Sequence, residues 1–431
     1  MNDYAFGNRL CALRRQAGLT QQEAANRLGV TNKAVSKWET GKSKPSVNAL
    51  RQLSALYHVS VEELLTLREE TPAPLIRKIV ITGGPCAGKT TAMSWVQNAF
   101  GDRGWQVLFV PETATELITG GVAPWTCGSN LEYQRCQLTL QLEKEAVFLA
   151  AAKTMKAKKV LIVCDRGALD NKAYMTAHEF ASLTEELRTG EVLLRDGYDA
   201  VFHLVTAAKG AEAFYTTANN QARRETPQQA AALDDKLIAA WTGHPHLRII
   251  DNSTGFEDKM KRLIAEIALS LGEPEPREIE RKFLIKKPDV ALLAQARPIE
   301  IMQTYLKSAP EEEVRVRQRG DGRHFVYYKT VKRPVNALTR VETEERLTEK
   351  EYLRLLMEAD PSRRPIRKTR YCLTYENQYF EIDLYPFWEE EALMEIELAS
   401  ETAPVKLPPF LKILREVTGE EAYTNAALAK A

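Results

Sequence analysis

The stretch REIERKFLIKK, residues 277–287, opens the last third of the chain and indicates how that third folds. Glu278, Glu280 and Lys282 alternate along it, so all three side chains point to one face if the stretch is a β-strand. Ile279 and Phe283 then point to the other face. Two acids and a base on one strand face need an explanation, which the later strands supply.

Charged residues recur, mostly at alternate positions, in six later stretches with strand-like sequences. They are Arg315, Arg317, Arg319, Lys329, Glu342, Glu344, Lys368, Arg370, Glu381, Asp383, Glu395 and Glu397. Solvent-facing amphipathic strands explain one or two such rows. A larger set, sorted into acid-rich and base-rich strands, favours a closed antiparallel barrel with a charged interior and with helices, such as 349–360, on its apolar outer face.

A charged interior costs free energy unless the charges are compensated. A polyphosphate chain with divalent cations would compensate it, because arginine and lysine bind phosphate oxygens and carboxylates bind Mg²⁺ or Mn²⁺. The motif E-x-E-x-K at Glu278, Glu280 and Lys282, together with LREVTGEEAYTNAALA at 414–429, resembles the CYTH fold of the triphosphate tunnel metalloenzymes over nearly all of 276–431. The resemblance implies an eight-stranded α+β tunnel that hydrolyses a triphosphate compound.

The resemblance also implies roles for individual residues. The expected metal ligands are Glu278, Glu280, Glu395 and Glu397, assisted by Asp383 and by Glu342 or Glu344. The expected triphosphate ligands are Lys282, Arg315, Arg317, Lys329, Lys368 and Arg370. Glu278, Glu280 and Lys282 are the expected catalytic residues, in a mechanism where metal-bound water attacks a terminal phosphate. The choice within each glutamate pair stays open, because a one-residue error in register exchanges the two faces.

The middle of the chain carries a second phosphate motif, in RKIVITGGPCAGKTTAMSWV at 77–96. Gly83-x4-Gly88-Lys89-Thr90 fits the P-loop, between an apolar strand and a helix as that motif requires. Further apolar runs at 105–112, 158–167, 199–206 and 246–253 predict a parallel sheet covered on both faces. This segment is therefore expected to be an α/β domain that binds ATP or GTP.

Candidate residues of this nucleotide site lie in the loop and at the ends of the strands. Those for nucleotide binding are Gly83, Gly84, Gly88, Lys89, Thr90, Thr91 and Arg166, with Thr90 also a Mg²⁺ ligand. Asp165 suits a second position around Mg²⁺ or a strand-end cap, and Glu112 suits a base or a substrate ligand. Arg223 and Arg224 either neutralise phosphate charge or lie on a solvated helix. Residues 77–270 resemble the P-loop family grouped around the NadR kinase domain and the TRPL translocation defect protein of flies, which leaves open whether phosphate is transferred, hydrolysed or sensed.

The first 67 residues predict short helices joined by tight turns. Thr20 and Glu23 form a capping-box pattern, and Thr31 is placed to cap the next helix. The segment has nine Lys and Arg against five acids, the local excess that phosphate contact needs. It resembles the XRE helix-turn-helix family, which implies contact with double-stranded DNA, and the alternative is a helical bundle for dimerisation. Candidate DNA contacts are Gln21, Gln22, Thr31, Asn32, Lys33 and Lys37.

The expected division is 1–67 for the helix-turn-helix, 77–270 for the P-loop domain and 277–431 for the tunnel, with linkers at 68–76 and 271–276. Six cysteines without a CxxC pair, no signal-peptide pattern and no long apolar run predict a reduced cytoplasmic protein without a zinc site or membrane span. The six histidines form no ligand cluster and are interpreted as structural or surface residues.

Three functions remain open. The first is a metal-dependent triphosphatase coupled to a nucleotide-binding domain and a DNA-binding module. The resemblance of that module to the XRE family implies a homodimer. The second is a transcriptional regulator that senses nucleotide or polyphosphate with little turnover. The third is a P-loop nucleoside or nucleotide kinase whose product the tunnel consumes.

Overall fold

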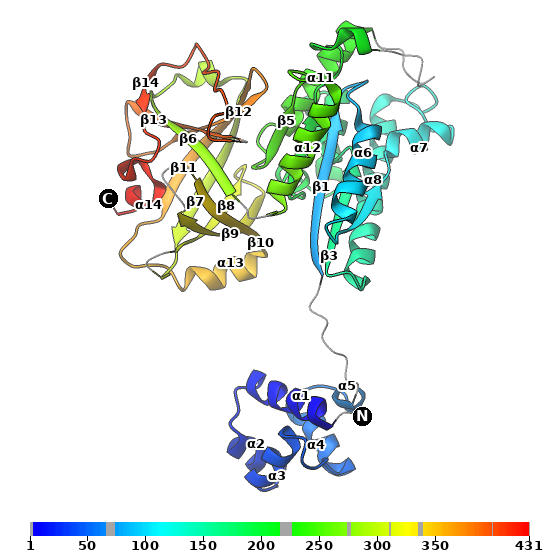
Figure 1. Cartoon of the computed structure of the whole chain (residues 1–431), viewed down its shortest axis with the longest axis vertical. Coiled ribbons are helices and arrows are strands. Elements are labelled where there is room, and N and C mark those ends of the chain that lie inside the picture. Colours follow the sequence, from blue (N-terminus) through cyan, green and yellow to red (C-terminus); the bar gives the residue numbers. More distant parts are fainter. Residues whose placement is uncertain are drawn as a thin grey trace. The chain divides into compact units, whose positions relative to one another are not determined.

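The computed structural model describes residues 3–65, 74–215, 226–273, 277–309, 312–334, 339–398 and 400–430. The chain forms two compact units, Met1–Ala73 and Pro74–Ala431 (Figure 1). The multidomain architecture expected from the sequence, with an all-α, an α/β and an α+β part, is confirmed. The second unit contains both of the larger parts, here called the P-loop half (74–273) and the tunnel half (277–430).

The first unit is a bundle of short helices. These are α1 (Asp3–Gln16), α2 (Gln21–Leu28), α3 (Asn32–Glu39), α4 (Val47–Tyr57) and α5 (Val61–Leu65). The predicted capping box is present, since Thr20 and Glu23 bond each other's backbone N–H, and Thr31 caps α3 by accepting from Ala34 N at 3.2 Å. Buried Leu28, Val35 and Leu53 hold the helices together.

The P-loop half is a parallel sheet in the strand order β2-β3-β1-β4-β5. Its strands are β1 (Leu75–Gly83), β2 (Gln106–Val110), β3 (Lys159–Asp165), β4 (Ala200–Leu204) and β5 (Leu247–Ile250). Its helices are α6 (Lys89–Gly101), α7 (Thr113–Thr119), α8 (Asn130–Thr154), α9 (Ala177–Glu186), α10 (Glu191–Arg195), α11 (Pro227–Trp241) and α12 (Phe256–Ser270), with 3-10 turns η1 (Ala168–Tyr174) and η2 (Glu212–Phe214). Helices α6 and α12 pack on one face of the sheet and α8 and α11 on the other, which explains why the strands are apolar throughout.

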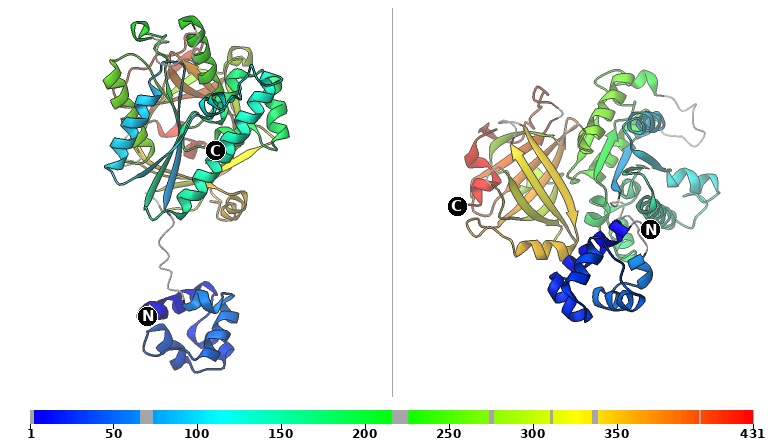
Figure 2. Two further views of the ribbon diagram at one scale, coloured as in Figure 1. Left: turned by 90° about the vertical axis from the view of Figure 1, so that its right-hand side faces the viewer. Right: turned by 60° about the horizontal axis from the view of Figure 1, so that its bottom comes forward.

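The tunnel half is an antiparallel sheet that closes on itself (Figures 1 and 2). Its strands are β6 (Arg277–Lys286), β7 (Arg297–Tyr305), β8 (Glu313–Gly320), β9 (Phe325–Pro334), β10 (Thr339–Leu347), β11 (Ile366–Tyr375), β12 (Gln378–Leu384), β13 (Glu391–Glu397) and β14 (Ile413–Glu416). The order is β10-β9-β8-β7-β11-β12-β13-β6, and β10 pairs back onto β6, so eight strands form the predicted tunnel. The short strand β14 adds to a free part of the β6 edge.

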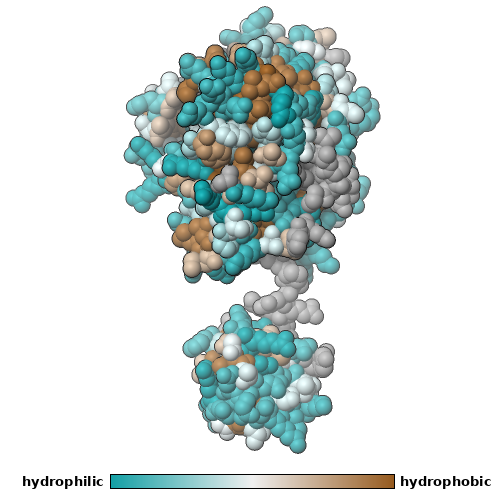
Figure 3. All heavy atoms as spheres, turned by 90° about the vertical axis from the view of Figure 1, so that its left-hand side faces the viewer, coloured by the Kyte–Doolittle hydropathy of each residue, from teal (hydrophilic) through white to brown (hydrophobic). Residues whose placement is uncertain are grey.

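The outer face of this sheet is apolar, as predicted. Helix α13 (Glu349–Leu356) covers part of it by packing Tyr352 against Val316 and Leu306. Helix α14 (Asn425–Leu428) and the turns η3 (Val290–Leu293) and η4 (Glu421–Tyr423) complete the half. On the side shown in Figure 3, hydrophobic patches are small and separated by hydrophilic side chains, so no broad apolar face is visible there.

The two halves share a buried polar interface. Arg319 of β8 lies 3.3 Å from Asp196 Oδ2 and donates to the carbonyl of Gly243 at 2.6 Å. Both Arg319 and Asp196 are almost wholly buried, at 2% and 1% exposed. The halves therefore contact each other through ordered ionic groups as well as through apolar side chains.

Candidate functional site

The charged strand faces of the tunnel half line one cavity of about 650 Å³. The tunnel residues around it include Glu280, Lys282, Gln303, Glu313, Arg315, Arg317, Tyr328, Lys332, Glu342, Glu344, Arg346, Lys368, Arg370, Glu381, Glu395 and Glu397. The structure thus brings together the rows that alternate in the sequence. They face a shared, partly open cavity, and most of the apolar residues between them face outward.

Arg370 is the centre of one wall. Its guanidinium donates to both carboxylate oxygens of Asp383 at 2.7 Å and to Glu395 Oε2 at 3.0 Å, and it also pairs with Glu381. Burial favours the neutral carboxyl, but Lys282 and Arg370 outweigh it and hold the pKa of Glu395 well below its usual range. Glu395 is therefore ionised and available as an acceptor or a metal ligand.

Two lysines complete this wall. Lys282 Nζ lies 2.8 Å from Glu395 Oε1, and Lys368 pairs with Asp383. Burial, aided by Arg370, lowers the pKa of Lys368 to about 8. A buried cation with a weakened proton affinity is stabilised by any further negative charge that enters the cavity.

The facing wall comes from β8, β9 and β10. Arg317 donates to Glu344 at 2.5 Å, and Lys332 lies 2.7 Å from Glu342 Oε2. Thr330 Oγ1 also donates to Glu344 at 3.0 Å. Burial raises the pKa of Glu344, but Arg317 and His246 together lower it far below the usual range. Each of these carboxylates stands beside a basic side chain.

Several predicted residues lie elsewhere. Lys329 is on the outer face of β9, because Tyr328 and Lys332 line the cavity and strand side chains alternate. Its expected role as a triphosphate ligand is corrected, and Lys332 takes the inward position. The side chain of Glu278 lies outside the described residues, although its main chain pairs with Arg340. Asp383 is deeper than the cavity lining, at 0% exposed.

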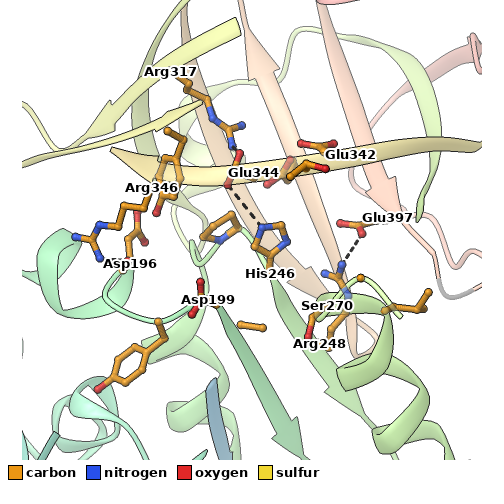
Figure 4. Close-up of a pocket in the computed structure, with 18 of the residues that line it drawn as sticks. Asp196, Asp199, His246, Arg248, Ser270, Arg317, Glu342, Glu344, Arg346 and Glu397 are labelled. Atoms are coloured by element: carbon orange, nitrogen blue, oxygen red, sulfur yellow. Dashed lines mark hydrogen bonds and ion pairs between the residues drawn. The ribbon is translucent and has the colours of Figure 1, made fainter. Parts of the chain in front are cut away.

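The P-loop half also lines this cavity, and two of its residues pair there with carboxylates of the tunnel half (Figure 4). His246, just before β5, places Nε2 3.7 Å from Glu344 Oε1, and Arg248 forms an ion pair with Glu397. Of the six histidines, which were interpreted from the sequence as structural or surface residues, His246 lies in the lining of this cavity. Nothing in the local sequence distinguishes these two residues, because their position depends on how the halves dock.

The P-loop forms at the start of α6. Gly88 has φ 93°, and in the described structure no side chain caps the helix, which leaves its first N–H groups for an anion. A Cβ on Gly88 would lie 2.6 Å from the Phe256 ring, and one on Gly83 would lie 2.2 Å from the carbonyl of Leu204. Gly84 N donates to Asp234 Oδ1 at 3.0 Å, which anchors the loop from α11.

The remaining candidates gather around this loop. Lys89, Thr90 and Thr91 form the first turn of α6. Arg166 donates to Glu112 at 2.5 Å, and although burial raises the pKa of Glu112, Arg166 and Lys89 bring it down to about 2. Asp165 Oδ1 is buried and has no hydrogen-bond partner among the described residues, which is consistent with a carboxylate that binds a cation or a cation-bound water. Arg223 and Arg224 lie outside the described residues.

The helix-turn-helix candidates are mostly accessible. Gln22, Thr31, Asn32, Lys33 and Lys37 are exposed or partly exposed. Gln21 is partly buried and donates to Glu39 at 2.8 Å, and Glu39 also binds Arg14 at 2.6 Å. Gln21 therefore helps to fix α2 against α3, and the more exposed residues remain accessible to a ligand.

Both sites offer oxygen donors to a metal ion. All proposed ligands carry oxygen, which suits Mg²⁺ or Mn²⁺. In the part of the chain that is described, no three His, Cys, Asp or Glu residues converge on one point. All six cysteines are free. Within the described ranges, every helix is too short or too polar to span a membrane.

Fold and site together define a three-part protein with a helix-turn-helix, a P-loop sheet and a triphosphate tunnel. A helix-turn-helix family model matches residues 12–64, and an AAA domain model matches residues 78–259. The inorganic triphosphatase of Nitrosomonas europaea is 34% identical over 156 residues, which are 35% of this chain and 96% of that protein. The chain belongs, through its C-terminal third, to the family of this triphosphatase.

Three further matches cover parts of the chain. The HTH-type transcriptional activator BcrR of Enterococcus faecalis is 39% identical over 64 residues, or 15% of this chain. The chain spans 31% of BcrR and 39% of the regulator PuuR of Escherichia coli, so about a third of each. A crystal structure of an inorganic triphosphatase is 30% identical, covers 36% of this chain and 95% of that one, and has a TM-score of 0.26.

Proposed function

We propose that the tunnel half hydrolyses a phosphoanhydride bond of a triphosphate compound with the help of Mg²⁺ or Mn²⁺. The observation that carries this proposal is the enclosed cavity in which carboxylates pair with arginines and lysines. Such pairs prepare a site for an exchange of partners. Phosphate oxygens replace the carboxylates around the basic groups, and the carboxylates are released for cations.

The proposed phosphate ligands are Lys282, Arg315, Arg317, Lys332, Lys368 and Arg370. The proposed metal ligands are Glu278, Glu280, Glu395 and Glu397, with Asp383 and Glu342 or Glu344 in support. A bound divalent cation would neutralise phosphate charge and lower the pKa of the attacking water. The arginines and lysines orient the chain of phosphates and stabilise the charge that develops on the leaving oxygen.

The P-loop half is proposed to bind ATP or GTP. Gly83, Gly84, Gly88 and the start of α6 would hold the phosphates, Lys89 and Arg166 would neutralise them, and Thr90 with Asp165 would serve a Mg²⁺. Glu112 is already paired with Arg166, so we assign it to orienting that arginine or a substrate hydroxyl. The helix-turn-helix is proposed to bind double-stranded DNA, with α3 as the contacting helix.

A second function, nucleotide sensing, is favoured by helix α11. Asp234 in α11 accepts a hydrogen bond from Gly84 N in the P-loop. The same helix ends at Trp241, which is five residues before His246. Helix α11 thus connects the P-loop with the segment that carries His246 into the tunnel cavity. The proposed domain division remains 1–67, 77–270 and 277–431, with linkers at 68–76 and 271–276.

The experiment is a phosphate-release assay with tripolyphosphate, ATP, GTP and thiamine triphosphate. Each is measured with Mg²⁺, with Mn²⁺ and after chelation of both. We expect release from at least one triphosphate, and expect chelation to abolish it. No turnover of any compound, together with altered DNA binding when nucleotide is added, would favour the sensing function instead.

A further inference from the structure

Two basic side chains of the P-loop half lie at one end of the tunnel. Arg248 of β5 is paired with Glu397, and its Nε lies 3.3 Å from Glu266 Oε2. His246 Nε2 lies 3.7 Å from Glu344 Oε1. Figure 4 shows both side chains directed from β5 towards the carboxylates of the tunnel. The cavity therefore receives basic groups from a part of the chain that is not in the tunnel fold.

The other end of the charged rows is apolar. Leu284 follows Lys282 on the same face of β6, and Leu393 precedes Glu395 on β13. Both are buried in a cluster with Tyr305, Val417 and Ala429, the last of these in the C-terminal segment. A linear triphosphate that lies along the charged rows thus has one end near this cluster and the other end near Arg248 and His246.

The docking of the two halves has its own ionic contacts. Arg319, Asp196 and Gly243 form a buried network, in which the side chains of Arg319 and Asp196 are 3% and 0% exposed. The side chains of Arg248 and His246 are more open, at 23% and 37% exposed. They also line the cavity, whereas Arg319 does not. Their position suits contact with a ligand better than support of the interface.

We propose that Arg248, with His246 beside it, is a substrate-positioning residue that binds the phosphate at the P-loop end of the tunnel. The proposal rests on the function proposed above. Once Glu397 binds a cation, Arg248 Nη2 loses this partner while Nε stays beside Glu266, and Nη2 can then donate to the incoming phosphate. A charged terminal phosphate fits this end better than a neutral organic group.

The test compares kcat and KM for tripolyphosphate with Mg²⁺ in the wild type, Arg248→Ala and Arg248→Lys. Arg77→Ala is the matched control, because Arg77 lines the same cavity but faces Asp199 of its own half. We expect Arg248→Ala to raise KM by about tenfold and to change kcat by less than about twofold. The KM of Arg248→Lys should lie between the values for the wild type and Arg248→Ala. The KM of Arg77→Ala should equal that of the wild type.

An unchanged KM in Arg248→Ala, or an equal rise in Arg77→Ala, would overturn the proposal. Thermal unfolding identifies a variant that fails to fold, and Arg248→Gln then replaces Arg248→Ala. A wild type without hydrolysis would contradict the proposed function alone. In that case, calorimetric titration with tripolyphosphate decides: about tenfold weaker binding by Arg248→Ala supports the positioning role, and equal binding overturns it.

Discussion

Asp234 shows how one buried carboxylate can organise a phosphate loop. It accepts from Gly84 N and Thr206 N, at 3.0 and 3.1 Å, and contacts His203 and Lys209. Burial alone raises the pKa of Asp234, but the hydrogen bond and charge of His203, with Lys209, lower it to about 2 from its ordinary 3.8. Because the folded pKa lies below the unfolded one, its stabilisation is complete above pH 3.8 and is lost as the pH falls through 2.

We therefore predict that the wild type loses about 2 kcal/mol more stability than Asp234→Asn between pH 5 and pH 2. Thermal unfolding across this range measures the difference. At neutral pH the variant should be less stable and should bind ATP more weakly, since Gly84 loses its charged acceptor. Parallel pH curves for the two proteins would show that Asp234 does not act in this way.

Mutations on the two faces of strand β9 test which face belongs to the site. Lys332 lines the cavity beside Glu342, and Lys329 lies on the outer face. We predict that Lys332→Ala raises the KM for tripolyphosphate by about tenfold, since the variant cannot form one charge-assisted hydrogen bond to phosphate. Lys329→Ala, on the same strand, should leave KM unchanged. The reverse result would mean that the register of β9 is shifted by one residue.

Helix α3 is the element on which DNA contact depends. Lys33 and Lys37 are exposed on it. Removing one lysine that binds a DNA phosphate should reduce the slope of log affinity against log salt by about 0.9. We predict this change for Lys37→Ala, measured by fluorescence anisotropy on a duplex selected from a random library. Arg51→Ala on α4 (also exposed) is the control, and equal slopes in all three proteins would contradict contact through Lys37.

The structural elements differ in how well their conformation and position could be predicted from the sequence. The P-loop and the capping box were predictable because both depend on contacts within a few residues. The tunnel was predictable from alternation, since an ionic row repeated on many strands needs a shared interior. The inner face of β9 was not predictable from its sequence. Each face carries one tyrosine and one lysine, Tyr327 with Lys329 on one and Tyr328 with Lys332 on the other, so the pattern favours neither. His246 and Arg248 were missed because their partners are about 100 and 150 residues away in sequence and meet them only when the halves dock.

At the scale of the whole molecule, two phosphate sites share one compact unit but lie on different parts of it. The P-loop is at the carboxyl ends of the parallel strands. His246 directly precedes β5 and therefore lies at the amino ends of these strands. Nucleotide binding and triphosphate hydrolysis are therefore expected to be separable by mutation. The central physical claim is that the paired ions of the tunnel are exchanged for phosphate and metal.

The most direct measurement of this claim is Mg²⁺-dependent phosphate release from tripolyphosphate by Glu280→Gln and Lys89→Ala, compared with the wild type. Glu280→Gln preserves size but removes a proposed metal ligand in the tunnel, and Lys89→Ala removes the P-loop cation. We predict that Glu280→Gln loses at least about a hundredfold in kcat, whereas Lys89→Ala retains hydrolysis and loses ATP binding. Loss of release in Lys89→Ala with full activity in Glu280→Gln would contradict the account.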